Sequence, residues 1–135
     1  MNIQVKIKNL DKFAAGLKQA PREITKRLDT AIWAAAGVIE QDAQDIIRTG
    51  RGYSKRPYDT GDMMDQTRRQ NRRALYAEVQ PNVEYAIYPH EGLGSSRRYG
   101  RRPFMEDAIK AKQSQIERLI GDQIEIVLTD IAKSV

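Results

Sequence analysis

The segment 85–104 reads YAIYPHEGLGSSRRYGRRPF and links an apolar stretch to a long amphipathic stretch. It starts with residues typical of a strand, passes through His90, Glu91 and Gly92, and crosses a loop with four arginines to a Pro-Phe pair. A basic loop between two regular elements is a common place for function on a rigid scaffold. We therefore expect this segment to carry the functional surface and the flanking elements to be scaffold.

After this segment, the sequence predicts a helix from Pro103 to about Lys133. Its apolar residues recur at three- and four-residue steps, and Glu106 and Asp107 in the first turn complement the helix dipole. The apolar stripe consists of Phe104, Ala108, Ile116, Leu119, Ile120, Ile124, Val127, Leu128 and Ile131. We expect this stripe to be part of the core.

Before the segment, the sequence predicts a two-stranded hairpin. Residues 74–79 (ALYAEV) and 83–88 (VEYAIY) have the composition of strands, and Gln80-Pro81-Asn82 between them supplies turn residues. The segment 67–73 precedes this hairpin and is rich in arginine. Its arginines are Arg68, Arg69, Arg72 and Arg73.

The first half of the chain predicts a short strand and two helices. Residues 2–8 alternate apolar and polar side chains, which favours an edge strand that could join the hairpin. Residues 10–19 predict a short helix. From Pro21 to about Thr49, the apolar spacing predicts a long helix, whose thin middle at 34–37 would let another backbone approach closely.

These elements predict a single α+β domain spanning residues 1–135, with a small antiparallel sheet between two long amphipathic helices, one N-terminal and one C-terminal. Two glycine-containing loops, at about 50–61 and 92–102, are expected to be mobile. Trp33 lies beside the apolar stripe of the first long helix. It either widens the buried face or marks a contact with another subunit.

Composition excludes several kinds of site. The chain has no cysteine and one histidine, so a disulfide framework, a thiolate metal site and a zinc centre are not expected. We expect no metal and no cofactor. The longest apolar run is far too short to cross a bilayer, and the N-terminal residues lack the apolar region of a signal peptide. We therefore expect no membrane partner.

Two groups of residues raise the question of catalysis. Asp59-Thr60-Gly61 matches the triplet of aspartic proteases, but it follows Arg56-Pro57-Tyr58 in a helix-rich chain, which favours a cap and turn into a short helix at 62–66. His90 and Glu91 are adjacent on a predicted strand, where neighbouring side chains point to opposite faces. Common nucleotide-binding and hydrolase motifs do not occur. A hydrolase is thus a disfavoured alternative, and we expect no enzymatic activity.

Positive charge is concentrated in the middle of the chain. The net charge is +5, and residues 67–102 match this excess with eight arginines against three glutamates. Half of these arginines lie in the loop, at Arg97, Arg98, Arg101 and Arg102. Arginines in this arrangement suit contact with DNA phosphates or with acidic side chains of a neighbouring subunit. A solvated basic face is the third interpretation.

The order of these parts resembles a known family. A long amphipathic helix, a D-T-G turn and a hairpin are followed by Y-A-x-Y-x-x-E-G at 85–92 and R-P-F-M-x-x-A at 102–108. This order is similar to that of the tail-completion or neck proteins of long-tailed bacteriophages, which join the tail to the DNA-filled head. The matching residues are Asp59, Thr60, Gly61, Tyr85, Ala86, Tyr88, Glu91, Gly92, Arg102, Pro103, Phe104, Met105 and Ala108. The sequence departs from the family at Pro89, where an apolar β-branched residue is more common, and in its arginine-rich segment.

The resemblance implies a structural virion protein that forms a ring, expected to be hexameric, around the passage for DNA. The implied partners are further copies of the chain, other neck, connector or tail-tube proteins, and DNA contacted without sequence preference. The implied location is the virion, with assembly in the host cytoplasm. A small sequence-independent nucleic-acid-binding protein is the alternative, because it needs the same arginines but no ring.

Overall fold

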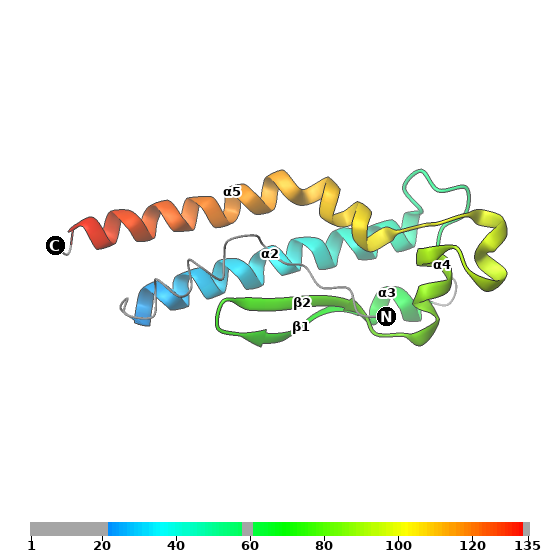
Figure 1. The fold of residues 1–135 in the computed structure, drawn as a ribbon, viewed down its shortest axis with the longest axis horizontal. Coiled ribbons are helices and arrows are strands. Elements are labelled where there is room, and N and C mark those ends of the chain that lie inside the picture. The colour runs from blue at the N-terminus through cyan, green and yellow to red at the C-terminus, as the bar shows by residue number, and fades with distance from the viewer. Residues whose placement is uncertain (1–21, 58–60, 134–135) are drawn as a thin grey trace.

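The computed structural model describes residues 22–57 and 61–133 of the 135-residue chain. Two long helices lie side by side and run in opposite directions, with a hairpin along one of them and short helices gathered at one end (Figure 1). These elements confirm the predicted α+β class. The strand expected at 2–8 and the helix expected at 10–19 lie outside the described residues.

The two long helices, α2 (Arg22–Thr49) and α5 (Phe104–Lys133), begin and end within about one residue of the predicted positions. Their apolar residues recur with the helical repeat, so each helix buries one continuous stripe. Leu128, which we expected among the buried apolar residues of α5, is instead 54% exposed. The largest fully buried apolar side chains are Leu28, Ile39, Ile46, Ile47, Val79, Phe104, Met105 and Val127.

The layer order differs from the prediction. The hairpin packs against α2, and α5 covers another side of the same helix, so α2 lies between them rather than the sheet between two helices (Figure 1). The sequence of α2 explains this position. Ile32, Ala35, Ala36 and Ile39 are all buried, which gives α2 an apolar surface wide enough for two neighbours.

The hairpin is formed one segment earlier than predicted. Its strands are β1 (Thr67–Arg73) and β2 (Tyr76–Pro81), which pair antiparallel in a two-stranded sheet. The arginine-rich segment is therefore the first strand. The chain reverses at Ala74 and Leu75. Leu75 has a positive φ of 57° although it is not a glycine. Only Thr67 is buried in β1, so this strand lacks the apolar alternation by which strands are recognised.

The predicted returning strand at 83–88 is helical. A 3₁₀ turn, η2 (Glu84–Ala86), leads directly into the short helix α4 (Ile87–Glu91). Pro89 fits there because the first turn of a helix needs no backbone N–H donor. The prediction of a strand was wrong. Ala86 is the one buried residue of η2, and a helical turn can bury a single residue as well as a strand can.

The thin middle of α2 accepts an arginine rather than another backbone. A Cβ atom at Gly37 would lie 2.3 Å from Nη1 of Arg69, so a larger residue here would have to displace this guanidinium. The same Nη1 donates to the backbone carbonyl of Trp33 at 3.1 Å. Gly37 thus gives the Arg69 guanidinium its place against α2.

The remaining elements close one end of the molecule. The short helix α3 (Asp62–Asp65) lies where the D-T-G turn predicts it, with Gly61 as its N-cap at a positive φ of 92°. The 3₁₀ helix η3 (Gly94–Tyr99) occupies most of the predicted basic loop. The expected mobility of the loops at 50–61 and 92–102 stays a prediction.

Candidate anion-binding pocket

Two arginines of β1 fasten the hairpin to α2. The guanidinium carbons of Arg69 and Arg72 lie 4.7 Å and 5.1 Å from the ring centroid of Trp33. Arg69 also lies 3.9 Å from a carboxylate oxygen of Glu40, and Arg72 lies 3.4 Å from one of Asp29. The ring of Trp33 therefore packs against the hairpin within one copy, and its contact with another subunit stays a prediction. Arg69 and Arg72, two of the predicted contact residues, therefore have partners within the chain.

The other two arginines of β1 are exposed. Arg68 donates through Nε to the backbone carbonyl of Asp65 at 2.7 Å, and Arg73 lies over the ring of Tyr76 at 4.0 Å. The hairpin thus does not present four equivalent cations. Arg72 is also exposed but is ion-paired with Asp29, so Arg68 and Arg73 are the exposed members of this group that form no ion pair with the described residues.

The arginines of the predicted loop also have unequal environments. Arg101 lies between two carboxylates, 3.5 Å from Glu91 and 3.1 Å from Glu106. Arg97 and Arg98 are exposed. Arg102 is almost completely buried, with 4% of its surface accessible. These four arginines are close together in sequence but differ in the structure. One is ion-paired, two are exposed and one is buried.

The buried guanidinium of Arg102 has only neutral partners. Nη1 donates to the backbone carbonyls of Lys55 and Arg56 at 3.1 Å and 3.3 Å, and Nη2 lies 3.1 Å from Oγ of Ser96. Nε has no hydrogen-bond partner. Burial lowers the pKa of Arg102, and no carboxylate of the described residues forms an ion pair with it. A buried cation without a counter-charge is costly.

Three cations surround one aromatic ring beside this arginine. Nζ of Lys55 lies 5.5 Å from the ring centroid of Tyr99, and the guanidinium carbons of Arg98 and Arg102 lie at 4.8 Å and 5.1 Å. These distances permit attraction to the ring face. The ring quadrupole offsets only part of the mutual repulsion of three like charges.

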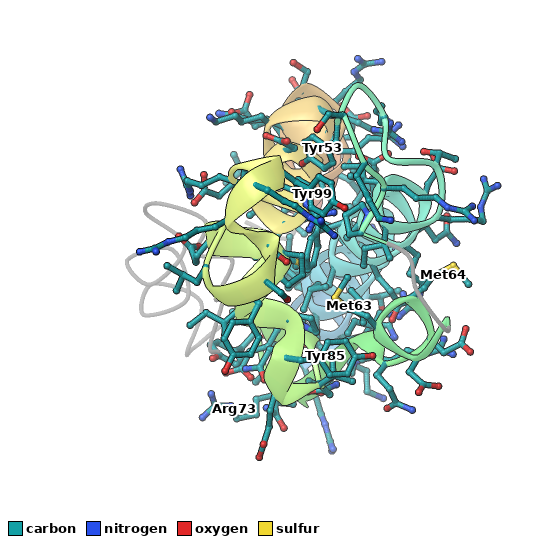
Figure 2. All side chains as sticks on the ribbon, turned by 90° about the vertical axis from the view of Figure 1, so that its right-hand side faces the viewer. Tyr53, Met63, Met64, Arg73, Tyr85 and Tyr99 are labelled. Carbon is teal, nitrogen blue, oxygen red and sulfur yellow. The ribbon has the colours of Figure 1, made fainter. Side chains whose placement is uncertain are left out.

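These residues line a pocket of about 370 Å³, which we call the cationic pocket. Its charged lining consists of Lys55, Arg56, Arg98 and Arg102, and no carboxylate belongs to the lining. Tyr99, Tyr85 and Tyr88 supply aromatic surface, and the last two are 43% and 48% exposed. Figure 2 views the molecule from this end, with Tyr99 and Tyr85 on the face toward the reader. The arrangement suits an anion that is flanked by apolar groups.

Ion pairs and a partly buried hydrogen bond fix the loop that carries Lys55. Arg51 donates to Asp42 at 2.7 Å and 3.0 Å and to Asp45 at 2.6 Å, which anchors the start of the loop to α2. The hydroxyl of Tyr53 donates to the carboxylate of Asp107 in the first turn of α5. Burial and this hydrogen bond raise the pKa of Tyr53 above its ordinary value. The loop whose backbone carbonyls accept hydrogen bonds from Arg102 is therefore anchored to both α2 and α5.

The histidine environment differs from the prediction. His90 and Glu91 lie at the end of α4 rather than on a strand, and Nδ1 of His90 is 2.7 Å from Oε1 of Glu91. Adjacent side chains can meet here because the helical turn does not send them to opposite faces. His90 is 2% exposed and packs edge-to-face on Phe104 at 5.0 Å. Its ring is thus a buried contact between α4 and α5.

The family-motif residues gather around the same end of the molecule. Gly92 ends α4 with φ 68°, and a Cβ atom there would lie 2.8 Å from the backbone of Gly100, so the two ends of the loop meet at this glycine. Phe104 begins α5 directly after Pro103 and is fully buried. Asp59 and Thr60 lie outside the described residues.

The structure adds residues that the sequence analysis did not select as contact residues. Lys55 and Arg56 lie far from the arginine-rich segments in sequence but share the pocket with Arg98. The basic pair between Tyr53 and Pro57 is a signal that could have identified them. Lys55, Arg56 and Tyr88 meet only in the tertiary fold, and no sequence pattern predicts that they share a pocket.

Comparisons with protein-family models, curated proteins and solved structures found no match. Within residues 22–57 and 61–133, no cluster of three or more His, Cys, Asp or Glu residues is arranged to hold a metal ion. No helix among these residues has the length and apolar character needed to span a membrane.

Proposed function

We propose that the protein is a structural component of the neck or tail end of a long-tailed bacteriophage virion. In this role it completes the tail and joins it to the head, as one copy in a ring around the passage for DNA. The proposal takes its identity from the sequence resemblance. Its physical support is the cationic pocket, where Lys55, Arg98 and Arg102 have no carboxylate partner within the described chain. An uncompensated cluster of this kind favours an external anionic partner.

The geometry favours binding over chemistry in this pocket. Its lining contains cations, tyrosines, serines and prolines, but no carboxylate or histidine that would act as a general base. The acid–base pair nearest in sequence, His90 and Glu91, contains a histidine that is almost fully buried. An assembly contact needs no proton transfer, so these features suit a structural role.

The shape of the molecule also suits assembly. The antiparallel helices α2 and α5 form a long body. Its two ends differ, because the short helices gather at only one of them (Figure 1). A ring needs two different surfaces on each copy that fit each other and close. Contacts of this kind would leave the exposed Arg68, Arg73 and Arg97 free to face DNA phosphates without reading sequence.

A small sequence-independent nucleic-acid-binding protein is the second candidate. It is favoured by the exposure of Arg97 and Arg98 on η3. Titration of duplex DNA at several salt concentrations tests it. Replacing both arginines with Ser should then lower the salt slope by about two units at most, because each neutralised phosphate contributes about 0.9. Arg101 and Arg102 are engaged within the chain and should add little.

Deletion of the gene in the genome that encodes the chain tests the leading proposal. We expect DNA-filled heads and separate tails to accumulate, because the joint between them is missing, and electron microscopy of the lysate counts both. Supplying the intact chain in trans should restore joined particles. Joined, infectious particles at the normal yield without the gene would reject the proposal.

A further inference from the structure

The outer face of α5 has an exposed stripe that no contact within the described chain explains. Glu117, Gly121 and Glu125 follow one another at four-residue spacing, so they lie on one face of the helix. All three are exposed, as is Leu128 on the next turn. We call these four residues the α5 stripe.

Gly121 is the most informative residue of the stripe. A glycine in a helix interior destabilises the helix relative to alanine. A Cβ atom at Gly121 would meet nothing within 4 Å, so packing within the described residues does not require the glycine. A missing side chain on an exposed helix face lets another surface approach the backbone closely.

The chemistry of the stripe complements the cationic pocket. Glu117 and Glu125 form no ion pair with the described residues, and Glu117 accepts one hydrogen bond from Gln113 at 3.1 Å. Leu128 adds apolar surface. Arg118 is exposed on the same side of the helix, but the neighbouring Asp122 balances its charge and leaves the stripe acidic. The pocket offers Lys55, Arg98 and Arg102, which form no ion pair with the described residues, beside exposed tyrosines.

The two surfaces cannot meet within one copy. The cationic pocket lies at the end where α4 and η3 gather, and the stripe lies on the half of α5 nearer the C-terminus, toward the other end (Figure 1). We propose that the α5 stripe of one copy docks into the cationic pocket of a second copy of this chain. This contact is heterologous, as a closing ring requires, so the inference rests on the proposed function.

The shape of the pocket favours a side-chain carboxylate over the phosphates of a duplex. Arg102 is 4% exposed, so its charge acts from the base of a recess rather than from a flat surface. A glutamate side chain extends from its helix and can enter a recess. The backbone of duplex DNA is broad and meets exposed surface cations instead. Aromatic and arginine side chains are also enriched where protein surfaces bind each other.

Charge-reversal substitutions in the purified full-length chain test the contact. Sedimentation over a range of protein and salt concentrations should show reversible self-association that weakens with salt. Arg98→Glu and Glu125→Arg should each lower the association constant at least about tenfold, and the double variant should regain much of the loss. Arg97→Glu is the matched control, because Arg97 is exposed on the same η3 helix but does not line the pocket.

Several results would overturn the inference. These are a chain that stays monomeric at every concentration and salt, a double variant no better than either single variant, and an Arg97→Glu effect equal to that of Arg98→Glu. A loss of duplex DNA binding in Arg98→Glu with unchanged self-association would assign the pocket to phosphate. Failure here, with a gene deletion that still leaves heads and tails unjoined, would reject this contact and retain the neck proposal.

A substitution at the glycine provides an independent measurement. Gly121→Gln should raise the melting temperature of the monomer, because glutamine is a better helix former. The same variant should weaken self-association, because the new side chain blocks close approach. A raised melting temperature with unchanged association would overturn the role of Gly121 and with it the proposed docking face.

Discussion

Arg102 shows how far residue type alone can mislead. By sequence it belongs to a run of four loop arginines, and it also belongs to the R-P-F-M motif. In the structure its guanidinium supports the backbone of Lys55 and Arg56 from inside, and burial lowers its pKa. Sequence cannot separate it from Arg97, because the difference lies in residues 46 and 47 positions away that pack over one side chain and not the other.

Arg102→Met tests this structural role. Methionine keeps the apolar stem but leaves two carbonyls and Ser96 without a donor, so we expect a loss of about 1–3 kcal/mol in the free energy of unfolding. Arg97→Met, at an exposed position of the same segment, should stay within about 0.5 kcal/mol of the wild type. Denaturant unfolding of both variants measures the difference. Equal small losses would show that Arg102 is a surface residue.

Tyr53 predicts a dependence on alkaline pH. Its pKa is raised in the folded state, so the folded protein retains the phenolic proton more strongly than the unfolded chain. The resulting stability is complete below the unfolded pKa of about 10 and is lost as pH rises above it. Tyr53→Phe should therefore be less stable than the wild type by about 1 kcal/mol at pH 8, and this difference should shrink above pH 10. Unfolding curves from pH 8 to 11 measure it, and a constant difference would contradict the assignment.

At the scale of elements, the long helices were predictable and the hairpin was not. In α2 and α5 the apolar spacing repeats over many turns, so small local exceptions do not obscure it. In β1 the only buried residue is Thr67, and the strand is held by contacts to α2 instead of by its own apolar face. Those contacts, from Arg69 and Arg72 to Trp33, join segments that are distant in sequence.

A double-mutant cycle tests how the hairpin is held. Trp33→Leu removes the aromatic face and Arg69→Met removes the cation above it. We expect a coupling energy of about 0.5–1 kcal/mol between these substitutions, because each destroys the same cation–π contact. Pairing Trp33→Leu with Arg68→Met, where no contact with Trp33 occurs, is the control and should give additive losses. Additivity in both cycles would show that the stacking contributes nothing to stability.

At the scale of the whole molecule, the order of parts carried more information than any single motif. The sequence places a basic segment between two helices, and the structure folds that segment into one end of a long body with α2 at its centre (Figure 1). The cationic pocket could not be read from the sequence, because Lys55 reaches Tyr99 only after the loop that follows α2 has folded back. We propose that the cations at one end and the exposed glutamates of α5 toward the other form the contact between neighbouring copies.

We propose above that this chain is a ring-forming part of the joint between head and tail. Electron cryomicroscopy of that joint, in particles made from the genome that encodes the chain, tests it most directly. We expect a closed ring of copies around the DNA, with the helix pair α2–α5 recognisable in each copy and the pocket of one copy facing α5 of the next. A joint built entirely from other chains, with no density for this one, would contradict it.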